Sequence, residues 1–240
     1  MEDSRELNGN LAIKDETPVP SPYDASWVQA TLCNISHLIS PSVLLVGEPQ
    51  LRMTCESVAL EDIKCEKFLE EKYRLHRALM EFRNVNGFGR SIAAPQIGVT
   101  KRFLAINMGK GMGMILLSRN SNVSVYFTGP FTLINPTITF KSEKLISLWD
   151  DCMSFPFLLV RKQRHASVSV KFVDDEGVTH EWKDLDTATS ELLQHEIDHL
   201  DGILALDEPF GKNGIVSREV YEKNREYFDR EVDYVIEPTI

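Results

Sequence analysis

Apolar residues recur at helical spacing in two long stretches of the chain. The first, residues 62–84, intersperses its apolar side chains among many charges, which predicts an amphipathic helix; they are Ile63, Phe68, Leu69, Leu75, Leu79 and Phe82. The second, residues 188–200, places Leu192, Leu193 and Ile197 on one stripe. Asp186 precedes it as a candidate N-cap, and Gly202 follows as a stop. Similar spacing predicts a helix at 26–39 and a final charged helix at 217–234.

Strict alternation of apolar and polar residues marks the region between the two long helices. Residues 166–173 and 178–182 alternate in this way, and the turn signal at 174–177 between them predicts a β-hairpin. Residues 101–107 and 123–127 are typical of strands, and 131–140 is typical of extended structure with a bend at Asn135-Pro136. Antiparallel strands followed by a late helix predict an α+β fold.

The polarity of the chain divides it into four parts. Residues 1–22 are polar and rich in proline, which predicts a flexible tail. We expect an N-terminal helical extension at 23–42, a main domain at 43–210, and a C-terminal helix and tail at 211–240. The length of 240 residues fits one domain with such extensions.

Charge and composition exclude several classes of partner. The net charge is −10, and residues 218–240 carry four basic and seven acidic side chains. Nucleic acid is therefore not expected as a ligand, and the acidic C-terminus does not support docking on the ribosome. The four cysteines form no Cys-x-x-Cys pair, no apolar run reaches membrane length, and the first residues resemble no signal peptide. These observations predict a cytoplasmic protein.

The predicted late helix carries the motif His195-Glu196-Ile197-Asp198-His199. Because residues four apart project from the same face of a helix, His195 and His199 can bind one metal ion. Glu196 lies between them and can handle the proton of a water molecule activated by that ion. The motif predicts a metal-dependent hydrolase whose class depends on the third ligand.

Two positions are candidates for the third metal ligand. A zincin-type metallopeptidase would use a downstream residue, and Asp207 or Glu208 would have to serve because no histidine follows His199. The other candidate is upstream, at Cys152 within Trp149-Asp150-Asp151-Cys152-Met153-Ser154. A thiolate binds Fe²⁺ or Zn²⁺ strongly, although a lone cysteine is more often a small buried residue.

A glycine- and alanine-rich segment, residues 87–98, precedes these motifs and ends near Gln96. Three segments in this order resemble the peptide deformylase family. The last matches the family pattern in full from Gln194 to Gly202. The second keeps the Cys and Ser of the family's Glu-Gly-Cys-Leu-Ser as Asp-Asp-Cys-Met-Ser. The first, Gly89-Arg90-Ser91-Ile92-Ala93-Ala94-Pro95-Gln96, matches Gly-x-Gly-x-Ala-Ala-x-Gln except at Ser91.

The resemblance implies antiparallel sheets around a central metal-binding helix, and it assigns roles to individual residues. Cys152, His195 and His199 would bind the metal, which the family suggests is Fe²⁺, although Zn²⁺ or another divalent ion would also suit the ligands. Glu196 would transfer protons. The side chain of Gln96 and the backbone N–H of Met153 would stabilise the oxyanion. The implied reaction releases formate from an N-formylated peptide or from formyl-methionine.

Two departures from the family pattern border the site. Asp151 and Ser91 replace glycines, which raises the alternatives of altered acyl specificity or a catalytically silent relative. The expected substrate-binding residues are Gly89, Ser91, Ile92, Asp151, Phe155 and Leu193. The apolar members could form a pocket for a methionine-like side chain, and core packing explains them equally well. Supporting roles are expected for Ser154 and for an ion pair between Asp150 and Arg161, whose alternative is two exposed charges.

Overall fold

The computed structural model describes residues 42–107, 114–117, 124–127 and 130–237. The expected tail at 1–22 and nearly all of the extension at 23–42 lie outside these residues. The described part has the expected α+β fold. Its helices are α2 (Glu66–Asn86), α3 (Thr187–Leu200), α4 (Arg218–Lys223) and α5 (Arg225–Asp229). None of them is long and apolar enough to cross a membrane.

Three antiparallel sheets accompany the described helices. The largest has the strand order β1-β2-β5-β8-β9, with β1 at one edge. Its strands are β1 (Ser91–Ala93), β2 (Phe103–Ile106), β5 (Phe131–Lys141), β8 (Val168–Val173) and β9 (Thr179–Trp182). The second has the order β10-β7-β6, with β6 (Leu145–Asp151), β7 (Leu158–His165) and β10 (Ile215–Ser217). The third pairs β3 (Met114–Leu117) with β4 (Ser124–Phe127).

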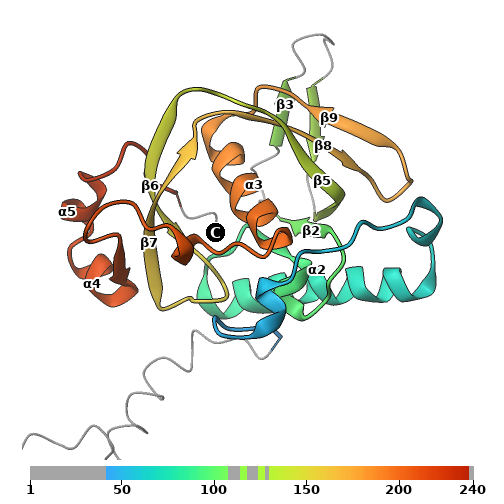
Figure 1. The fold of residues 1–240 in the computed structure, drawn as a ribbon, viewed down its shortest axis with the longest axis horizontal. Coiled ribbons are helices and arrows are strands. Elements are labelled where there is room, and N and C mark those ends of the chain that lie inside the picture. The colour runs from blue at the N-terminus through green and yellow to red at the C-terminus, as the bar shows by residue number, and fades with distance from the viewer. Residues whose placement is uncertain (1–41, 108–113, 118–123, 128–129, 238–240) are drawn as a thin grey trace, which may run out of the picture. The chain divides into compact units, whose positions relative to one another are not determined.

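Helix α3 lies between the two larger sheets (Figure 1). Asp186 caps it by accepting a hydrogen bond from the backbone N–H of Thr189, as predicted. Leu193, Ile197 and Leu200 pack with side chains of the five-stranded sheet, while the histidine face is turned toward the Cys152 loop. Burial of the apolar face of α3 against the five-stranded sheet therefore directs the histidine face toward Cys152.

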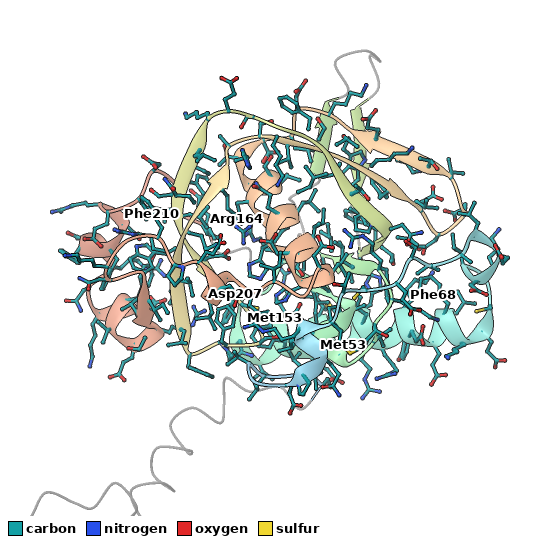
Figure 2. All side chains as sticks on the ribbon, in the orientation of Figure 1. Met53, Phe68, Met153, Arg164, Asp207 and Phe210 are labelled. Atoms are coloured by element: carbon teal, nitrogen blue, oxygen red, sulfur yellow. The ribbon has the colours of Figure 1, made fainter. Side chains whose placement is uncertain are left out.

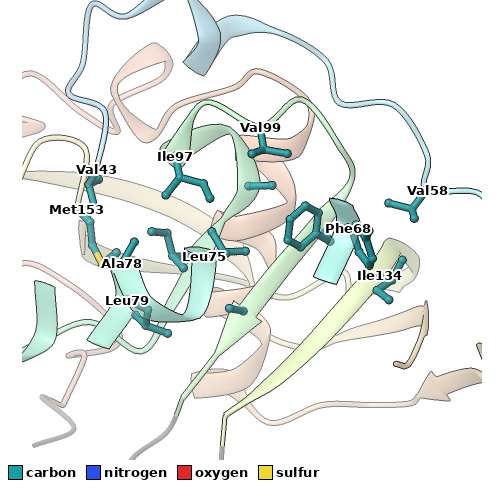
Figure 3. Close-up of a cluster of buried hydrophobic side chains, with 14 of the residues drawn as sticks. Val43, Val58, Phe68, Leu75, Ala78, Leu79, Ile97, Val99, Ile134 and Met153 are labelled. Carbon is teal, nitrogen blue, oxygen red and sulfur yellow. The ribbon is translucent and has the colours of Figure 1, made fainter. Parts of the chain in front are cut away.

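Helix α2 packs across the other side of β1 and β2. Phe68, Leu75 and Leu79 are fully buried there in one cluster with Ile97 and Ile134, and Figure 3 shows Phe68 next to Ile134. The sequence predicted this helix to within a few residues of its ends. It also predicted the β8–β9 hairpin and the interruption of β5, where Asn135 has a φ of 52° and the register shifts.

The C-terminal region differs from the single helix expected at 217–234. Strand β10 pairs with β7, and two short helices follow, separated at Asn224 with φ −127° and ψ 31°. Trp149 of β6 packs against Tyr221 and Phe228 from these helices. The C-terminal region is thus attached to the outer face of the β6–β7 hairpin.

Candidate active site

Three potential metal ligands converge on the buried face of α3. His195 and His199 lie one turn apart, and their Nε2 atoms are 3.2 Å from each other. Cys152 directly follows β6, and its Sγ lies 3.1 Å from Nε2 of His199. One donor atom from each residue lies within 4.8 Å of the others. Two nitrogens bound tetrahedrally at about 2.0–2.1 Å from one ion would be roughly 3.3 Å apart, so the donor set fits a single transition-metal ion.

Asp150 supports this group from the second sheet. Its Oδ1 lies 2.9 Å from Nδ1 of His195, which leaves Nε2 of that ring directed to the other ligands. Its Oδ2 accepts hydrogen bonds from Arg164 at 2.7 and 3.1 Å. Burial alone would raise the pKa of Asp150, but His195 and Arg164 outweigh burial and hold that pKa well below its usual value. The carboxylate therefore stays ionised and fixes the imidazole.

The expected ion pair between Asp150 and Arg161 is wrong, because the two side chains lie on opposite faces of the β6–β7 hairpin. Asp150 is opposite Val160 and Trp149 is opposite Arg161, so alternation turns Arg161 to the outer face. There its guanidinium lies 3.6 Å from Glu231 and stacks near Trp149. Arg164 lies on the same face of the β6–β7 hairpin as Asp150 and forms an ion pair with it. Figure 2 shows Arg164 beside α3.

Glu196 is held by one of the two residues that depart from the family pattern. The hydroxyl of Ser91 donates a hydrogen bond of 2.6 Å to Oε1 of Glu196. Oε2 is buried and has no hydrogen-bond partner among the described residues. Burial raises the pKa of Glu196, with His195 and Ser91 opposing that shift. One carboxylate oxygen is thus anchored, and the other is available to a reactant.

Gln96 faces the same space from the turn after β1. Its Oε1 accepts a hydrogen bond from the backbone N–H of Ala93, which fixes the orientation of the amide. Its Nε2 then points toward Oγ of Ser154 at 3.2 Å and Sγ of Cys152 at 3.6 Å. The amide group therefore presents N–H donors beside the metal ligands.

A cavity of about 230 Å³ opens against this cluster. Gly89, Ser91, Gln96, Asp151, Met153 and Glu196 are among the residues that line it. Gly89 has a φ of +117°, and a Cβ there would meet Sδ of Met153 at 3.3 Å. A larger residue at position 89 would therefore combine backbone strain with a tight contact in the cavity wall.

Three of the expected substrate-binding residues do not reach the cavity. Ile92 is turned by strand alternation toward α2, while Ser91 faces Glu196. Leu193 lies on the sheet-facing side of α3, and Phe155 packs behind Cys152 with Val160. All three are fully buried in the core. An apolar pocket built from these residues is therefore not present.

Charged residues that sequence reasoning did not select line the cavity instead. Arg90 donates a hydrogen bond of 2.5 Å to Glu191, which lies one helical turn before His195. Arg218 of α4 donates one of 2.9 Å to Asp151, and its guanidinium lies 4.3 Å from the ring centroid of Phe88. The spacing of Glu191 from His195 was a usable signal, but no sequence feature pointed to Arg218.

A cysteine sulfur and two imidazole nitrogens lie within 4.8 Å of one another, with a buried carboxylate and an amide donor beside them. This arrangement fits a mononuclear metallohydrolase site on an α+β fold. Residues 41–212 match the model of the polypeptide deformylase family. This match covers more than half of the chain, and the chain belongs to that family.

Individual relatives agree with the family match. A peptide deformylase of Treponema pallidum is 32% identical over 162 residues, which is 68% of this chain and 83% of that protein. The crystal structure of peptide deformylase from Thermotoga maritima has 26% identity and a TM-score of 0.54, and covers 70% of this chain and 97% of its own. A Met-Ala-Ser-bound peptide deformylase structure from Acinetobacter baumannii has a TM-score of 0.56 at 24% identity, covering 71% of this chain and 98% of its own, and supports the fold.

Proposed function

We propose that this chain hydrolyses the N-formyl group of a formylated peptide amino terminus and releases formate. The observation that carries the proposal is the convergence of Cys152, His195 and His199 next to Glu196, whose Oε2 has no hydrogen-bond partner within the described part of the chain. The Gln96 amide borders the same cavity. A small acyl carbon placed there would be within reach of a base and a hydrogen-bond donor.

The mechanism assigns a separate task to each side chain. A divalent ion held by the three ligands would lower the pKa of a water molecule and polarise the formyl carbonyl. Glu196 accepts the proton of the attacking water at Oε2, while Ser91 holds Oε1 in place. The same carboxyl group then delivers the proton to the departing amine nitrogen. Gln96 Nε2 and the backbone N–H of Met153 donate hydrogen bonds to the developing oxyanion.

The donor set also bears on the identity of the ion. Fe²⁺ is our first choice from the family resemblance, and Zn²⁺ suits one sulfur and two nitrogen ligands equally well. A buried Fe²⁺–thiolate site is sensitive to oxidation, so the iron form is best assayed without oxygen. Cys152 is only 3% exposed, which limits the access of bulky oxidants.

The alternative of a zincin-type metallopeptidase finds less support. Glu208, which is exposed, or Asp207 would have to act as the third ligand in that case. Oδ2 of Asp207 instead accepts hydrogen bonds from Arg52 at 2.6 Å and from the backbone N–H of Leu204 at 2.9 Å. Its carboxylate is therefore committed to the exit loop of α3, and Cys152 takes the third position beside the two histidines.

Formate release decides the proposal. Protein loaded with Fe²⁺ under anaerobic conditions, and separately with Zn²⁺, is incubated with formyl-Met-Ala-Ser and a panel of other formyl and acetyl tripeptides. We expect formate from formyl peptides, and a loss of about 10²–10⁴ in kcat with Glu196→Gln at unchanged metal content. Metal-loaded protein that releases formate from none of the formyl peptides would overturn the proposal and favour a catalytically silent relative.

A further inference from the structure

The wall of the cavity next to the metal ligands is built around a buried ion pair. Glu191 and His195 are four residues apart on α3, so their side chains follow one another along the same face. Arg90 directly precedes Ser91, the residue that holds Glu196. The side chain of Arg90 is 11% exposed and that of Glu191 only 1%. A substrate side chain that enters beside the reacting acyl group therefore meets this pair.

The pair keeps unused hydrogen-bonding capacity toward the cavity. A guanidinium has five N–H donors. Among the described residues, Arg90 donates one to Glu191 and one to the backbone carbonyl of Ala188 at 3.4 Å. An apolar side chain would remove the remaining water from Arg90 without replacing its hydrogen bonds, which is costly. A side chain with its own acceptor and donor would replace those bonds.

The charged residues that line the cavity also disfavour a charged substrate side chain. Each of its three arginines faces a carboxylate: Arg90 faces Glu191, Arg218 faces Asp151, and Arg225 faces Glu222. Glu196 and Glu237 also line the cavity, so the lining offers no unmatched cation to a carboxylate. An ammonium group that reached Glu191 would lie against the guanidinium of Arg90. A neutral group with both a donor and an acceptor matches the wall best.

We propose that the cleft selects formyl peptides whose first side chain is neutral and hydrogen-bonding, with a carboxamide of glutamine length as the best match, and that Arg90 and Glu191 determine this choice. The carboxamide oxygen accepts from Arg90, and its NH₂ group donates to Glu191. Glutamine and methionine side chains have similar length, so hydrogen bonding distinguishes them rather than size. This inference rests on the proposed deformylation.

The test compares two substrates on the full chain loaded with metal. We expect kcat/KM for formyl-Gln-Ala-Ser to exceed that for formyl-Met-Ala-Ser by at least about ten-fold, since a hydrogen bond to a charged group is worth roughly that factor or more. Formyl-Glu-Ala-Ser and formyl-Lys-Ala-Ser should both be poorer than the glutamine peptide. Turnover that favours methionine would overturn the inference while leaving deformylation intact.

Variants and product binding separate a specificity role from a structural one. Arg90→Leu combined with Glu191→Leu removes both charges together and should reverse the preference toward methionine; an unchanged ratio contradicts the inference. If the double variant does not fold, Arg90→Lys keeps the charge but loses the planar fork of the guanidinium. It should lower the ratio of kcat/KM for the glutamine peptide to that for the methionine peptide.

If no formyl peptide is hydrolysed, the deformylase proposal fails. Equilibrium binding of Gln-Ala-Ser against Met-Ala-Ser then still tests the pocket, and equal affinity counts against it.

Discussion

Asp150 shows how a single buried carboxylate couples the second sheet to the metal-binding helix. It is 2% exposed and contacts both His195 and Arg164. We expect Asp150→Asn to weaken metal binding by about 10–100-fold, because the amide cannot hold the His195 ring as a charged acceptor does. Competition with a chromophoric chelator measures this change.

The surface provides a matched control for that substitution. Asp174 lies 2.6 Å from Nε2 of His180, which repeats an Asp–His contact away from the cavity. Asp174→Asn should leave the affinity for metal unchanged. Equal affinities for the wild type and Asp150→Asn would show that Asp150 does not support the site.

Sequence motifs selected the three candidate metal ligands that lie together in the structure, but not the side chains that contact them. His195 and His199 share a helix face because they are four residues apart, which is a local feature of the sequence. The motif around Cys152 supplied the third candidate ligand. The pairing of Asp150 with Arg164 instead of Arg161 depends on the register of β6 and β7, which no local pattern specifies. The register of a hairpin decides which face each side chain occupies. Because the β6–β7 hairpin was not predicted, the partner of Asp150 could not be predicted from the sequence.

At the scale of elements, the contact between β6 and α4 compensates for the acidic residue before Cys152. Asp151 is 28% exposed and Arg218 17% exposed in their side chains. We expect a double-mutant cycle of Asp151→Ala and Arg218→Ala, measured by urea unfolding, to give a coupling free energy of about 1 kcal/mol. The same cycle on Glu219 and Lys223, which are 78% and 69% exposed, should give no measurable coupling free energy, because solvent screens the pair. Equal coupling free energies in the two cycles would contradict a stabilising contact between Arg218 of α4 and Asp151.

Elements with regular periodicity were predictable, and those with irregular periodicity were not. Helix α2 and the β8–β9 hairpin have clean apolar patterns and appeared near their expected positions. Strand β7 escaped prediction because Lys162 and Arg164 occupy buried positions where apolar residues are normally expected. The final helix was predicted too long because charge periodicity continues across Asn224, where the backbone leaves the helical conformation.

At the scale of the whole molecule, metal binding should be linked to folding. The three candidate ligands come from α3 and from Cys152, which follows β6, so an ion that bridges them favours the folded state. At about a hundred times the dissociation constant, Zn²⁺ should add about 2.7 kcal/mol and raise Tm by about 5–10 °C. Chelation should reverse the increase, as followed by scanning calorimetry. Cys152→Ala should abolish it, whereas Asp207→Ala should not; the reverse pattern would favour the metallopeptidase alternative.

The buried Glu191 should make the stability of the whole molecule depend on pH. Burial raises its pKa from 4.5 to about 7, because the loss of solvent outweighs the attraction of Arg90. Since the folded state then binds a proton more tightly than the unfolded state, this contribution is fully present below pH 4.5. It is lost as pH rises through 7, with an amplitude of about 3 kcal/mol.

Glu191→Gln removes that titration. The difference in unfolding free energy between the wild type and this variant, measured in urea with chelator present, should fall by that amount between pH 4.5 and pH 8. Using the difference cancels the titration of neighbouring groups such as Asp150. Glu219→Gln, on the exposed face of α4, provides the comparison and should give a nearly level profile. A level profile for Glu191→Gln as well would mean that the carboxyl stays ionised beside Arg90, and that the cavity wall is a fully charged pair at every pH tested.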